Sequence, residues 1–344
     1  MARSIPETIE ARLIQPQPLA PLIRDEYERP VADLIRPASE ITGDPLAAIL
    51  GIPFDTSIMG RRGAKGGPAA VREALGGCLC YEPGLDVDLS EAPRVADFGD
   101  VDVVHTDVDE TWRRVTDVVE ALVSTGSPLV TIGGDHGLAY PVIRGVAQAV
   151  GGRVGVISVD AHLDVRISHH GEKSSGVPFR YMLEELSDHI AGRNFVQFGI
   201  AGWLNTRSYR EYLREHDVRV ITAREMCRGD LDALIGEALE RAADGADAIY
   251  MTFDIDAVEG ATVGGTNVPA IAGLSPYQAL ELVWAFGNHP KAVGFDVMEV
   301  SPPWDPSGLS ERMAASLILN FIAGRHVAGE DRGASAAAAG AQRS

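Results

Sequence analysis

Cysteine is scarce in this sequence of 344 residues, and its spacing is uneven. The three cysteines are Cys78, Cys80 and Cys227. They are too few and too badly spaced for a disulfide framework, and they do not supply the four ligands of a structural zinc site. We therefore expect free thiols in a reducing compartment, and a cytoplasmic protein.

Long apolar runs and positive charge are also in short supply. No run approaches the roughly 20 residues that a membrane-spanning helix needs, and the first residues, MARSIPETIEARL, lack the apolar core of a signal peptide. The chain has 30 basic against 49 acidic side chains, so its formal net charge is −19. Phosphates would be repelled, and we expect no nucleic-acid partner and no membrane partner. The acidic excess is compatible with simple solubility, with a cationic ligand, or with clustered metal-binding carboxylates.

Proline is distributed unevenly along the chain. Seven of the twenty prolines lie in residues 1–45, which excludes a long regular helix there. We expect an extended arm with one short helix, packed on its own domain or on a neighbouring subunit. At the other end, residues 325–344 have a small and polar composition that is typical of a disordered tail. Residues 46–324 are expected to form one domain.

Short apolar runs alternate with longer amphipathic segments inside this domain. The runs are apolar throughout rather than alternating, as in strands that are buried on both faces. Alternating strands and helices predict a parallel sheet covered by helices, and such sheets bind ligands beyond the carboxyl ends of their strands. The expected strands are 46–52, 128–134, 153–160, 194–200, 218–222, 247–256 and 291–298. The expected helices include 107–124, 206–216, 229–243, 275–286 and 310–323.

Acidic and imidazole side chains follow three of the expected strands. In an extended backbone, residues 160, 162 and 164 of the run DAHLD point to the same side. A second strand ends in a pair of aspartates, and a third ends in Gly-Gly-Asp-His, where the glycines allow close approach. The residues concerned are His136, Asp160, His162, Asp164, Asp254 and Asp256.

Four aspartates in one pocket would repel one another unless a cation lay between them. Two divalent ions match four carboxylates in charge. A ligand set of carboxylates and imidazoles without thiolates suits manganese, nickel, cobalt or iron better than a structural zinc. A single Asp-x-Asp at a strand end is more often a loop cap than a metal site, but three such ends on one sheet indicate a binuclear centre, which would activate a water molecule.

Four segments of the sequence resemble the signature blocks of one enzyme family. These are GGDHGLAYP (133–141), SVDAHLD (158–164), TFDID (252–256) and MEVSP (298–302). Together they are similar to the ureohydrolase (arginase/agmatinase) superfamily, and the segment 51–75 resembles its agmatinase-like branch. The resemblance covers about residues 46–323. It implies an α/β fold, a three-layer α/β/α sandwich around an eight-stranded parallel sheet, and a homo-oligomer, either a trimer or a hexamer.

The resemblance also implies a chemistry and a role for each residue. It implies hydrolysis of a C–N bond in a small cationic guanidino or amidino compound, with Glu299 binding the guanidinium and Asp164 passing a proton to the leaving amine. Asp135 and Asp296 would orient the ligands. The cofactors would be two Mn²⁺ ions, or alternatively Ni²⁺. The implied ligands are His136 and Asp164 for one ion, His162 and Asp256 for the other, and Asp160 and Asp254 as bridges.

The sequence departs from the family pattern in two places. Ser175 stands where many arginases and agmatinases have a proton-shuttle histidine, and His169 and His170 nearby could replace it or have no role. The Ser-Ser-Gly at 174–176 and Arg166 resemble formiminoglutamases, and this arginine could bind a substrate carboxylate or form a salt bridge. The stretch 257–266 resembles a branch that includes guanidine, guanidino-acid and biguanide hydrolases, so the substrate stays open.

Three hypotheses about function follow. The first is a metal-dependent hydrolase of a guanidino, amidino or formimino compound, of which agmatine, guanidino acids, guanidine, biguanides and formiminoglutamate are examples. The second is a non-catalytic subunit in a hetero-oligomer with an active paralogue, because the shuttle histidine is missing. The third is a metal-dependent deacetylase, whose pocket would need a catalytic His-His pair that none of the strand-end motifs contains.

Overall fold

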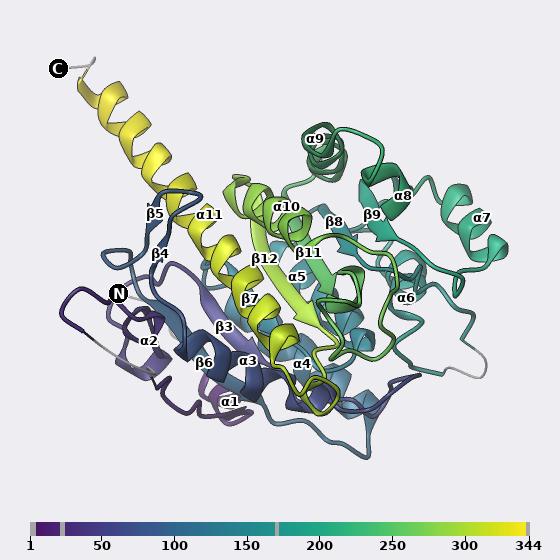
Figure 1. The fold of residues 1–344 in the computed structure, drawn as a ribbon, viewed down its shortest axis with the longest axis horizontal. Coiled ribbons are helices and arrows are strands. Elements are labelled where there is room, and N and C mark those ends of the chain that lie inside the picture. Colours follow the sequence, from purple (N-terminus) through teal and green to yellow (C-terminus); the bar gives the residue numbers. More distant parts are fainter. Residues whose placement is uncertain (1–4, 21–24, 169–171, 342–344) are drawn as a thin grey trace.

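A parallel sheet forms the centre of the computed structural model, which describes residues 5–20, 25–168 and 172–341, with side chains in the last helix up to residue 330 (Figure 1). Within the described residues, eight parallel strands lie in the order β6-β3-β7-β12-β11-β8-β9-β10, which confirms the expected sheet. Their bounds are β3 Ala48–Gly51, β6 Val95–Val101, β7 Leu129–Ile132, β8 Val154–Val159, β9 Phe195–Ile200, β10 Arg219–Thr222, β11 Ala248–Asp254 and β12 Ala292–Met298.

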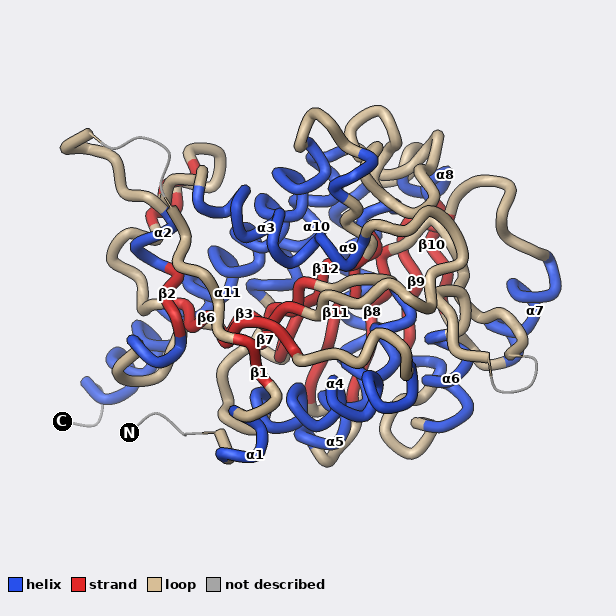
Figure 2. The backbone as a smooth tube through the Cα atoms, turned by 90° about the horizontal axis from the view of Figure 1, so that it is seen from below, coloured by secondary structure: helices blue, strands red, loops and turns tan. Residues whose placement is uncertain are grey.

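Helices cover both faces of this sheet and produce three layers (Figure 2). One face packs against α2, α3 and α8 to α11, and the opposite face packs against α1 and α4 to α7. The bounds are α1 Glu7–Glu10, α2 Val31–Leu34, α3 Gly67–Gly76, α4 Val108–Val123, α5 Ala139–Val150, α6 Pro178–Glu185, α7 Arg207–Glu215, α8 Ala223–Met226, α9 Leu231–Ala243, α10 Pro276–Asn288 and α11 Leu309–Ala341.

Shorter elements connect these layers. A small hairpin, β4 Tyr81–Glu82 and β5 Val87–Asp88, lies outside the main sheet. The 3₁₀ turns are η1 Ala38–Glu40, η2 Ala64–Gly66, η3 His136–Leu138, η5 Gly192–Asn194, η6 Ile255–Ala257 and η7 Pro302–Trp304.

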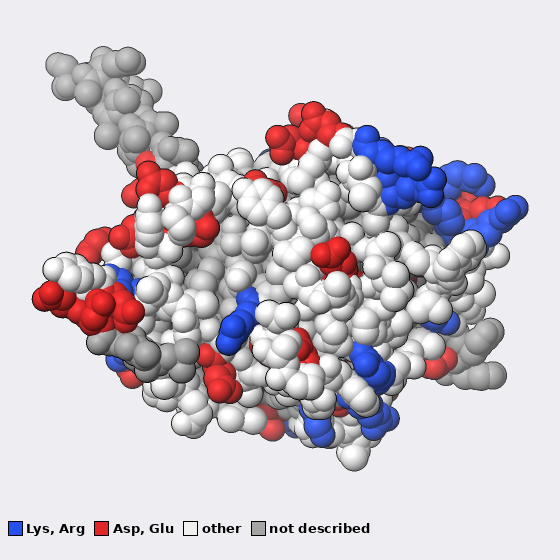
Figure 3. Space-filling model, in the orientation of Figure 1, with Lys and Arg blue, Asp and Glu red and all other residues white. Residues whose placement is uncertain are grey.

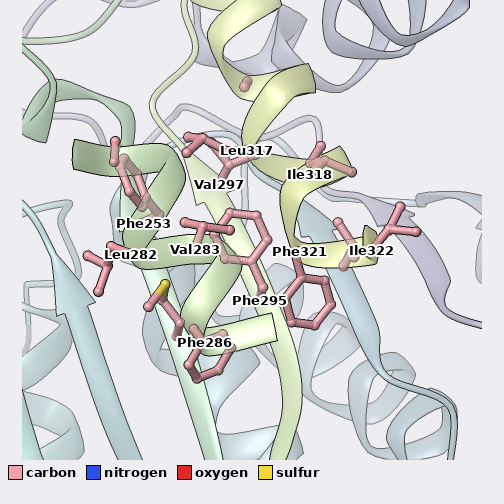
Figure 4. Packing of buried hydrophobic residues seen from close by; sticks show 14 of the residues in the cluster. Phe253, Leu282, Val283, Phe286, Phe295, Val297, Leu317, Ile318, Phe321 and Ile322 are labelled. Atoms are coloured by element: carbon pink, nitrogen blue, oxygen red, sulfur yellow. The ribbon is translucent and has the colours of Figure 1, made fainter. Parts of the chain in front are cut away.

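The continuous apolar character of the strands has a direct structural cause. Along β3, Ile49 packs into the core on one face of the sheet, whereas Ala48 and Leu50 pack into the core on the other face. Because both faces are covered, every position of the strand is buried, and no polar side of the strand is needed. On the face of α10 and α11, Phe321 stacks on Phe295 at 5.5 Å and on Phe286 at 6.0 Å between ring centroids (Figure 4).

Strand β6 was absent from the expected strands, because its sequence VADFGDV contains two aspartates. In the fold these charges are paired. The guanidinium of Arg72 on α3 donates to Asp97 at 2.8 and 2.9 Å and to Asp100 at 2.6 Å. A buried carboxylate is tolerated when a bidentate arginine satisfies it. The partner lies 25 residues earlier in the chain, so local sequence gave no signal.

The proline-rich arm packs on its own domain. It forms α1 and α2 rather than one short helix, and it adds two short strands, β1 Leu13–Ile14 and β2 Ile35–Pro37, to the sheet. Strand β1 pairs antiparallel with β6, and β2 pairs with the same strand in parallel. The arm therefore covers an edge of the sheet that would otherwise expose unpaired backbone groups.

The sequence predicted a disordered tail from residue 325 onward, and this prediction is wrong for the first residues of that segment. Helix α11 continues to Ala341, and Arg325 and Ala328 on it are buried. The guanidinium of Arg325 donates to the carbonyls of Gly287 and His289 at 3.3 and 2.8 Å, which satisfies backbone groups at the end of α10. Alanine, which is frequent beyond this point, has the highest helix propensity.

Charge on the molecular surface is mixed rather than uniformly acidic. On the face shown in Figure 3, basic and acidic side chains gather mainly near the margins and leave a broad neutral area between them. Among the described residues, no helix has both the length and the apolar character that crossing a membrane requires.

Candidate metal centre

Four neighbouring strands in the middle of the sheet end at one site. Strands β7, β12, β11 and β8 are adjacent, and the residues that follow or end them are the acidic and imidazole residues identified in the sequence. The carboxyl ends of parallel strands meet at the same edge of a sheet. The close approach of the loops requires glycine: a Cβ at Gly134 would lie 1.7 Å from the carbonyl oxygen of Phe54.

Asp160 lies at the centre of this site and is fully buried. Its Oδ2 lies 3.0 Å from Nδ1 of His136, and its Oδ1 lies 3.5 Å from Nδ1 of His162. The two oxygens of one carboxylate therefore face two different imidazoles. This is the arrangement that a carboxylate shared by two metal ions requires.

The remaining acids divide between the two imidazoles. Oδ2 of Asp164 lies 3.2 Å from Nδ1 of His136, and Oδ2 of Asp256 lies 3.0 Å from Nδ1 of His162. Two groups result, His136 with Asp160 and Asp164, and Asp160 with His162 and Asp256, each with its donor atoms within 4.8 Å of one another.

Asp254 lies beside these two groups. Its Oδ2 is 3.4 Å from Nδ1 of His136, while its Oδ1 accepts a hydrogen bond of 2.8 Å from the backbone N–H of Asp256. All six residues expected at the site therefore converge, and the bridging position expected for Asp254 stays a prediction.

A chain of hydrogen bonds fixes the ring of His136. The hydroxyl of Thr252 on β11 donates to Asp296 at 2.7 Å, so it can only accept from Nε2 of His136, which lies 3.1 Å away. The hydroxyl of Tyr250 donates to the other oxygen of Asp296 at 2.8 Å. Nδ1 of His136 is thereby directed at the carboxylates, the orientation that a metal-binding imidazole needs.

The electrostatics of the site call for a cation. Burial raises the pKa of Asp254 well above its ordinary value, and the carboxylates of Asp256 and Asp160 add to the rise. Burial and the Asp160 carboxylate also raise the pKa of Asp164 to about 6. Nδ1 of His136 and Oδ2 of Asp160 are buried without a hydrogen-bond partner among the described residues. Orphaned nitrogen and oxygen donors among mutually repelling carboxylates fit divalent metal ions.

Two residues of the site have strained backbones. Asp164 and Glu299 have φ angles of 42° and 66°, in the left-handed region that non-glycine residues rarely adopt. Such outliers persist where the surrounding structure imposes them, commonly at functional sites. At Glu299 the backbone N–H donates to the carbonyl of Gly134 at 2.8 Å, which ties the end of β12 to the loop that carries His136.

Glu299 is fully buried and turned toward the metal-site loops. Its Oε1 accepts hydrogen bonds from the backbone N–H of His136 at 2.9 Å and from Nδ2 of Asn267 at 3.5 Å. Its Oε2 has no hydrogen-bond partner among the described residues. Burial raises the pKa of Glu299 well above its ordinary value, with Asp135 contributing. A buried carboxylate oxygen that lacks a donor is suited to a cationic ligand.

Several supporting residues were missed by the sequence reasoning. Asn267 reaches Glu299, Thr252 orients His136, and the hydroxyl and N–H of Ser57 both donate to Asp135. Asp135 also accepts from the N–H of Gly137 at 3.1 Å, so it orders the loop around the histidine as expected. Asn267 and Ser57 lie outside the four signature blocks, and Thr252 was given no role within TFDID, because each of the three acts through a partner far along the chain.

Comparisons with known proteins agree with this geometry. The family model described as the Arginase family matches residues 46–324. The chain is 36% identical over 277 residues to the mitochondrial guanidino acid hydrolase of Homo sapiens, covering 80% of this chain and 77% of that protein. It is 34% identical to the mitochondrial agmatinase of Gallus gallus, covering 80% of each. The chain belongs to the arginase family.

A solved structure supports the fold and carries a metal. The formiminoglutamase of Trypanosoma cruzi with Mn²⁺ superimposes with a TM-score of 0.79 at 28% identity, covering 86% of this chain and 98% of that one. Membership of the arginase family makes this chain a hydrolase of amidine C–N bonds, as the sequence led us to expect. Two of these relatives carry the word mitochondrial in their names, so the cytoplasmic location stays a prediction.

The residues at which this chain departs from the family pattern have the following surroundings. Ser175 is buried, its N–H donates to the carbonyl of Ser57 at 3.0 Å, and its hydroxyl accepts from the N–H of Met59 at 3.2 Å. Arg166 is exposed and has no ion-pair partner among the described residues; its side chain lies across Gly176, where a Cβ would be 2.5 Å from its Cδ. His169 and His170 lie outside the described residues.

Proposed function

We propose that the chain is a binuclear-metal hydrolase that cleaves a C–N bond of a small guanidino or amidino compound, releasing urea or a related amide. The proposal rests on the position of Asp160. Its two carboxylate oxygens face the imidazoles of His136 and His162 inside a buried group of acids. A structural loop cap would not need such a concentration of unpartnered donors.

We propose two metal ions as cofactors, held by the six converging residues. Mn²⁺ is the first candidate, because a similar solved protein is described with it, and Ni²⁺ remains an alternative that the nitrogen and oxygen donors permit. When bound, such ions lower the pKa of a water molecule toward neutrality and so supply a nucleophile. His136 with Asp164 would hold one ion and His162 with Asp256 the other, while Asp160 and Asp254 would contribute to both.

The protein's own groups would perform the remaining steps. The free Oε2 of Glu299 binds the positive guanidinium or amidinium group and holds its carbon near the acids. Asp164 accepts a proton from the attacking water and delivers it to the leaving amine. Burial raises the pKa of Asp164 in the metal-free site, which favours the protonated form that this transfer requires.

The substrate class is a finer proposal. Arg166, whose side chain lies against Gly176 and has no ion-pair partner among the described residues, favours a substrate with an anionic end, such as a guanidino acid. A relative named guanidino acid hydrolase supports this choice over agmatine, whose far end is cationic. A formimino acid, as in formiminoglutamase, has the same anionic character and is the second candidate.

One assay series tests these proposals. The full chain is purified with Mn²⁺ and, in parallel, with Ni²⁺, and the release of urea, ammonia and formamide is measured. The substrates are 4-guanidinobutyrate, 3-guanidinopropionate, agmatine, guanidine, metformin and formiminoglutamate. We expect turnover of a guanidino acid with release of urea. Two bound metals without turnover of any substrate would overturn the enzyme proposal and favour a non-catalytic subunit.

We also propose a homo-oligomer, a trimer or a hexamer. A hetero-oligomer with a paralogue is the alternative. Light scattering of the purified chain measures the mass directly. A monomer at micromolar concentration would contradict the proposal.

A further inference from the structure

Three aromatic rings lie against the two described limbs, residues 164–168 and 172–175, of the segment between Asp164 and Ser175. Trp112 on α4, Tyr140 on α5 and Tyr181 on α6 contact one another, with ring centroids 5.1, 5.7 and 5.4 Å apart. The three helices lie on the same face of the sheet (Figure 2).

Both described limbs of the segment bond to this cluster. The hydroxyl of Tyr181 lies 3.1 Å from Oγ of Ser168 and 3.3 Å from the carbonyl oxygen of Glu172. The ammonium of Lys173 lies over the ring of Trp112, 4.8 Å from its centroid, and pairs with Asp109. Ser168, Glu172 and Lys173 are thus attached to the helices, a few residues before Ser175.

The contact of Lys173 with the Trp112 ring stabilises this attachment more than the ion pair of Lys173 with Asp109 does. Asp109 is 79% exposed, and an exposed ion pair is strongly screened by water and salt. The side chain of Lys173 is only 25% exposed, and Trp112 is almost fully buried. A cation over a desolvated indole ring gains more than a cation beside an exposed carboxylate.

A short path leads from this anchor to the metal centre. Two residues after Lys173, the N–H of Ser175 donates to the carbonyl of Ser57, and its hydroxyl accepts from the N–H of Met59. The hydroxyl of Ser57 donates to Asp135, which orders the loop of the adjacent histidine. The packing is tight, because a Cβ at Gly137 would lie 3.0 Å from the carbonyl oxygen of Ser174.

We propose that Lys173 is a positioning residue for substrate binding: its ammonium, held on the Trp112 ring, fixes residues 174–176 against the loop that contains Ser57 and Met59. The consequence for substrate affinity rests on the proposed hydrolase function. The ordering of the segment is independent of that function. Lys173 touches neither the substrate nor the six proposed metal ligands, so its loss changes KM rather than kcat.

The test compares Lys173→Met, which keeps an apolar side chain of similar length, with Lys173→Arg, which keeps a cation for the ring. A cavity of about 240 Å³ adjoins Lys173 and Trp112, so neither replacement overfills the site. The matched control is Arg36→Met, which removes a basic residue from an exposed ion pair with Glu40 and has no aromatic contact in the described structure.

The first measurement is hydrogen exchange of the Mn²⁺-loaded full chain. Lys173→Met should speed exchange in the peptides that contain Ser175 and Met59, while Lys173→Arg and Arg36→Met leave both peptides as in the parent. Unchanged exchange in Lys173→Met would overturn the proposal whether or not the chain is an active hydrolase.

The second measurement is kinetic, on the substrate that the assay series identifies. Lys173→Met should raise KM about two- to thirty-fold, the range that a cation–π contact spans, with kcat and metal content unchanged. Lys173→Arg should restore KM. An unchanged KM in Lys173→Met, a parallel loss of kcat and metals, or no restoration by arginine would each overturn the proposed effect on substrate. Absence of turnover in the parent chain would instead count against the proposed function.

Discussion

Oε1 of Glu299 accepts a hydrogen bond of 2.9 Å from the backbone N–H of His136. This contact joins the residue proposed to bind the substrate to a residue proposed to bind a metal. Oε1 is therefore already hydrogen-bonded, whereas Oε2 has no hydrogen-bond partner among the described residues. The direction of the carboxylate is therefore fixed by the metal-site loop rather than by the strand that precedes it.

Glu299→Gln should remove the charge that holds the guanidinium while keeping the hydrogen bond to His136. Hydrogen bonds to charged groups contribute about 1.5–3 kcal/mol, so we expect substrate affinity to fall about 10- to 100-fold. Both metal ions should remain. Inhibition by a non-hydrolysable alkylguanidine and metal content by mass spectrometry check this. Loss of the metals together with the activity would assign Glu299 to metal binding instead.

Asp256→Ala should release one of two metal ions and abolish turnover, because it removes the carboxylate closest to His162. Metal content per chain is the measurement. Asp232→Ala on the exposed surface of α9 is the matched control and should retain both ions. A variant with two ions and full activity would contradict the proposed centre.

Thr252→Val should weaken metal binding about 10- to 100-fold, the usual effect of removing a group that orients a metal ligand. Valine keeps the shape of threonine but cannot accept from Nε2 of His136. Thr252→Ser keeps the hydroxyl and should restore the affinity, as measured by competition with a chelator. Equal metal affinities of the Thr252→Val and Thr252→Ser variants would show that Thr252 contributes through packing alone.

The raised pKa of Asp164 predicts that the stability of the metal-free chain depends on pH. Its pKa is raised from an unfolded value near 3.9 to about 6, so the folded state binds more protons between these values. Its contribution to stability is therefore lost as pH rises from about 4 to about 6. Relative to Asp164→Asn, which tolerates the positive φ, the chelated parent chain should lose melting temperature over this range. A constant difference between the two would disprove the shift.

Arg166→Ala should raise KM for guanidino acids about 10-fold and leave KM for agmatine unchanged or lower. The physical reason is that the unpaired guanidinium is proposed to meet an anionic substrate end. Arg166→Lys keeps the charge and should raise KM for guanidino acids less than Arg166→Ala does. Equal effects on both substrates would remove Arg166 from substrate selection.

The strand ends were predictable because their signal is local. Buried strands give continuous apolar runs, and the acids that follow them stand out in DAHLD and TFDID. Parallel strands also bring their carboxyl ends to one edge, so the convergence of His136, Asp160 and Asp256 was expected from the fold class alone. The spacing by itself did not divide the acids between two imidazoles.

Other features depended on partners that are remote in sequence. Strand β6 was missed because Arg72, which neutralises its aspartates, lies on another element. The disorder expected from residue 325 onward is contradicted at Arg325, because the burial of Arg325 depends on the end of α10. Such contacts leave no periodic pattern in the residues themselves.

The sequence by itself determined the central strands other than β6 and the six converging residues, because both follow from short-range patterns, and the reaction class followed from the resemblance to the ureohydrolases. Only the tertiary structure decided that Asp160 faces both imidazoles, that Thr252 and Asp296 fix the ring of His136, and that Lys173 rests on Trp112. The reason is physical: hydrogen bonds and ring contacts depend on distance and direction in space, and chain folding sets both.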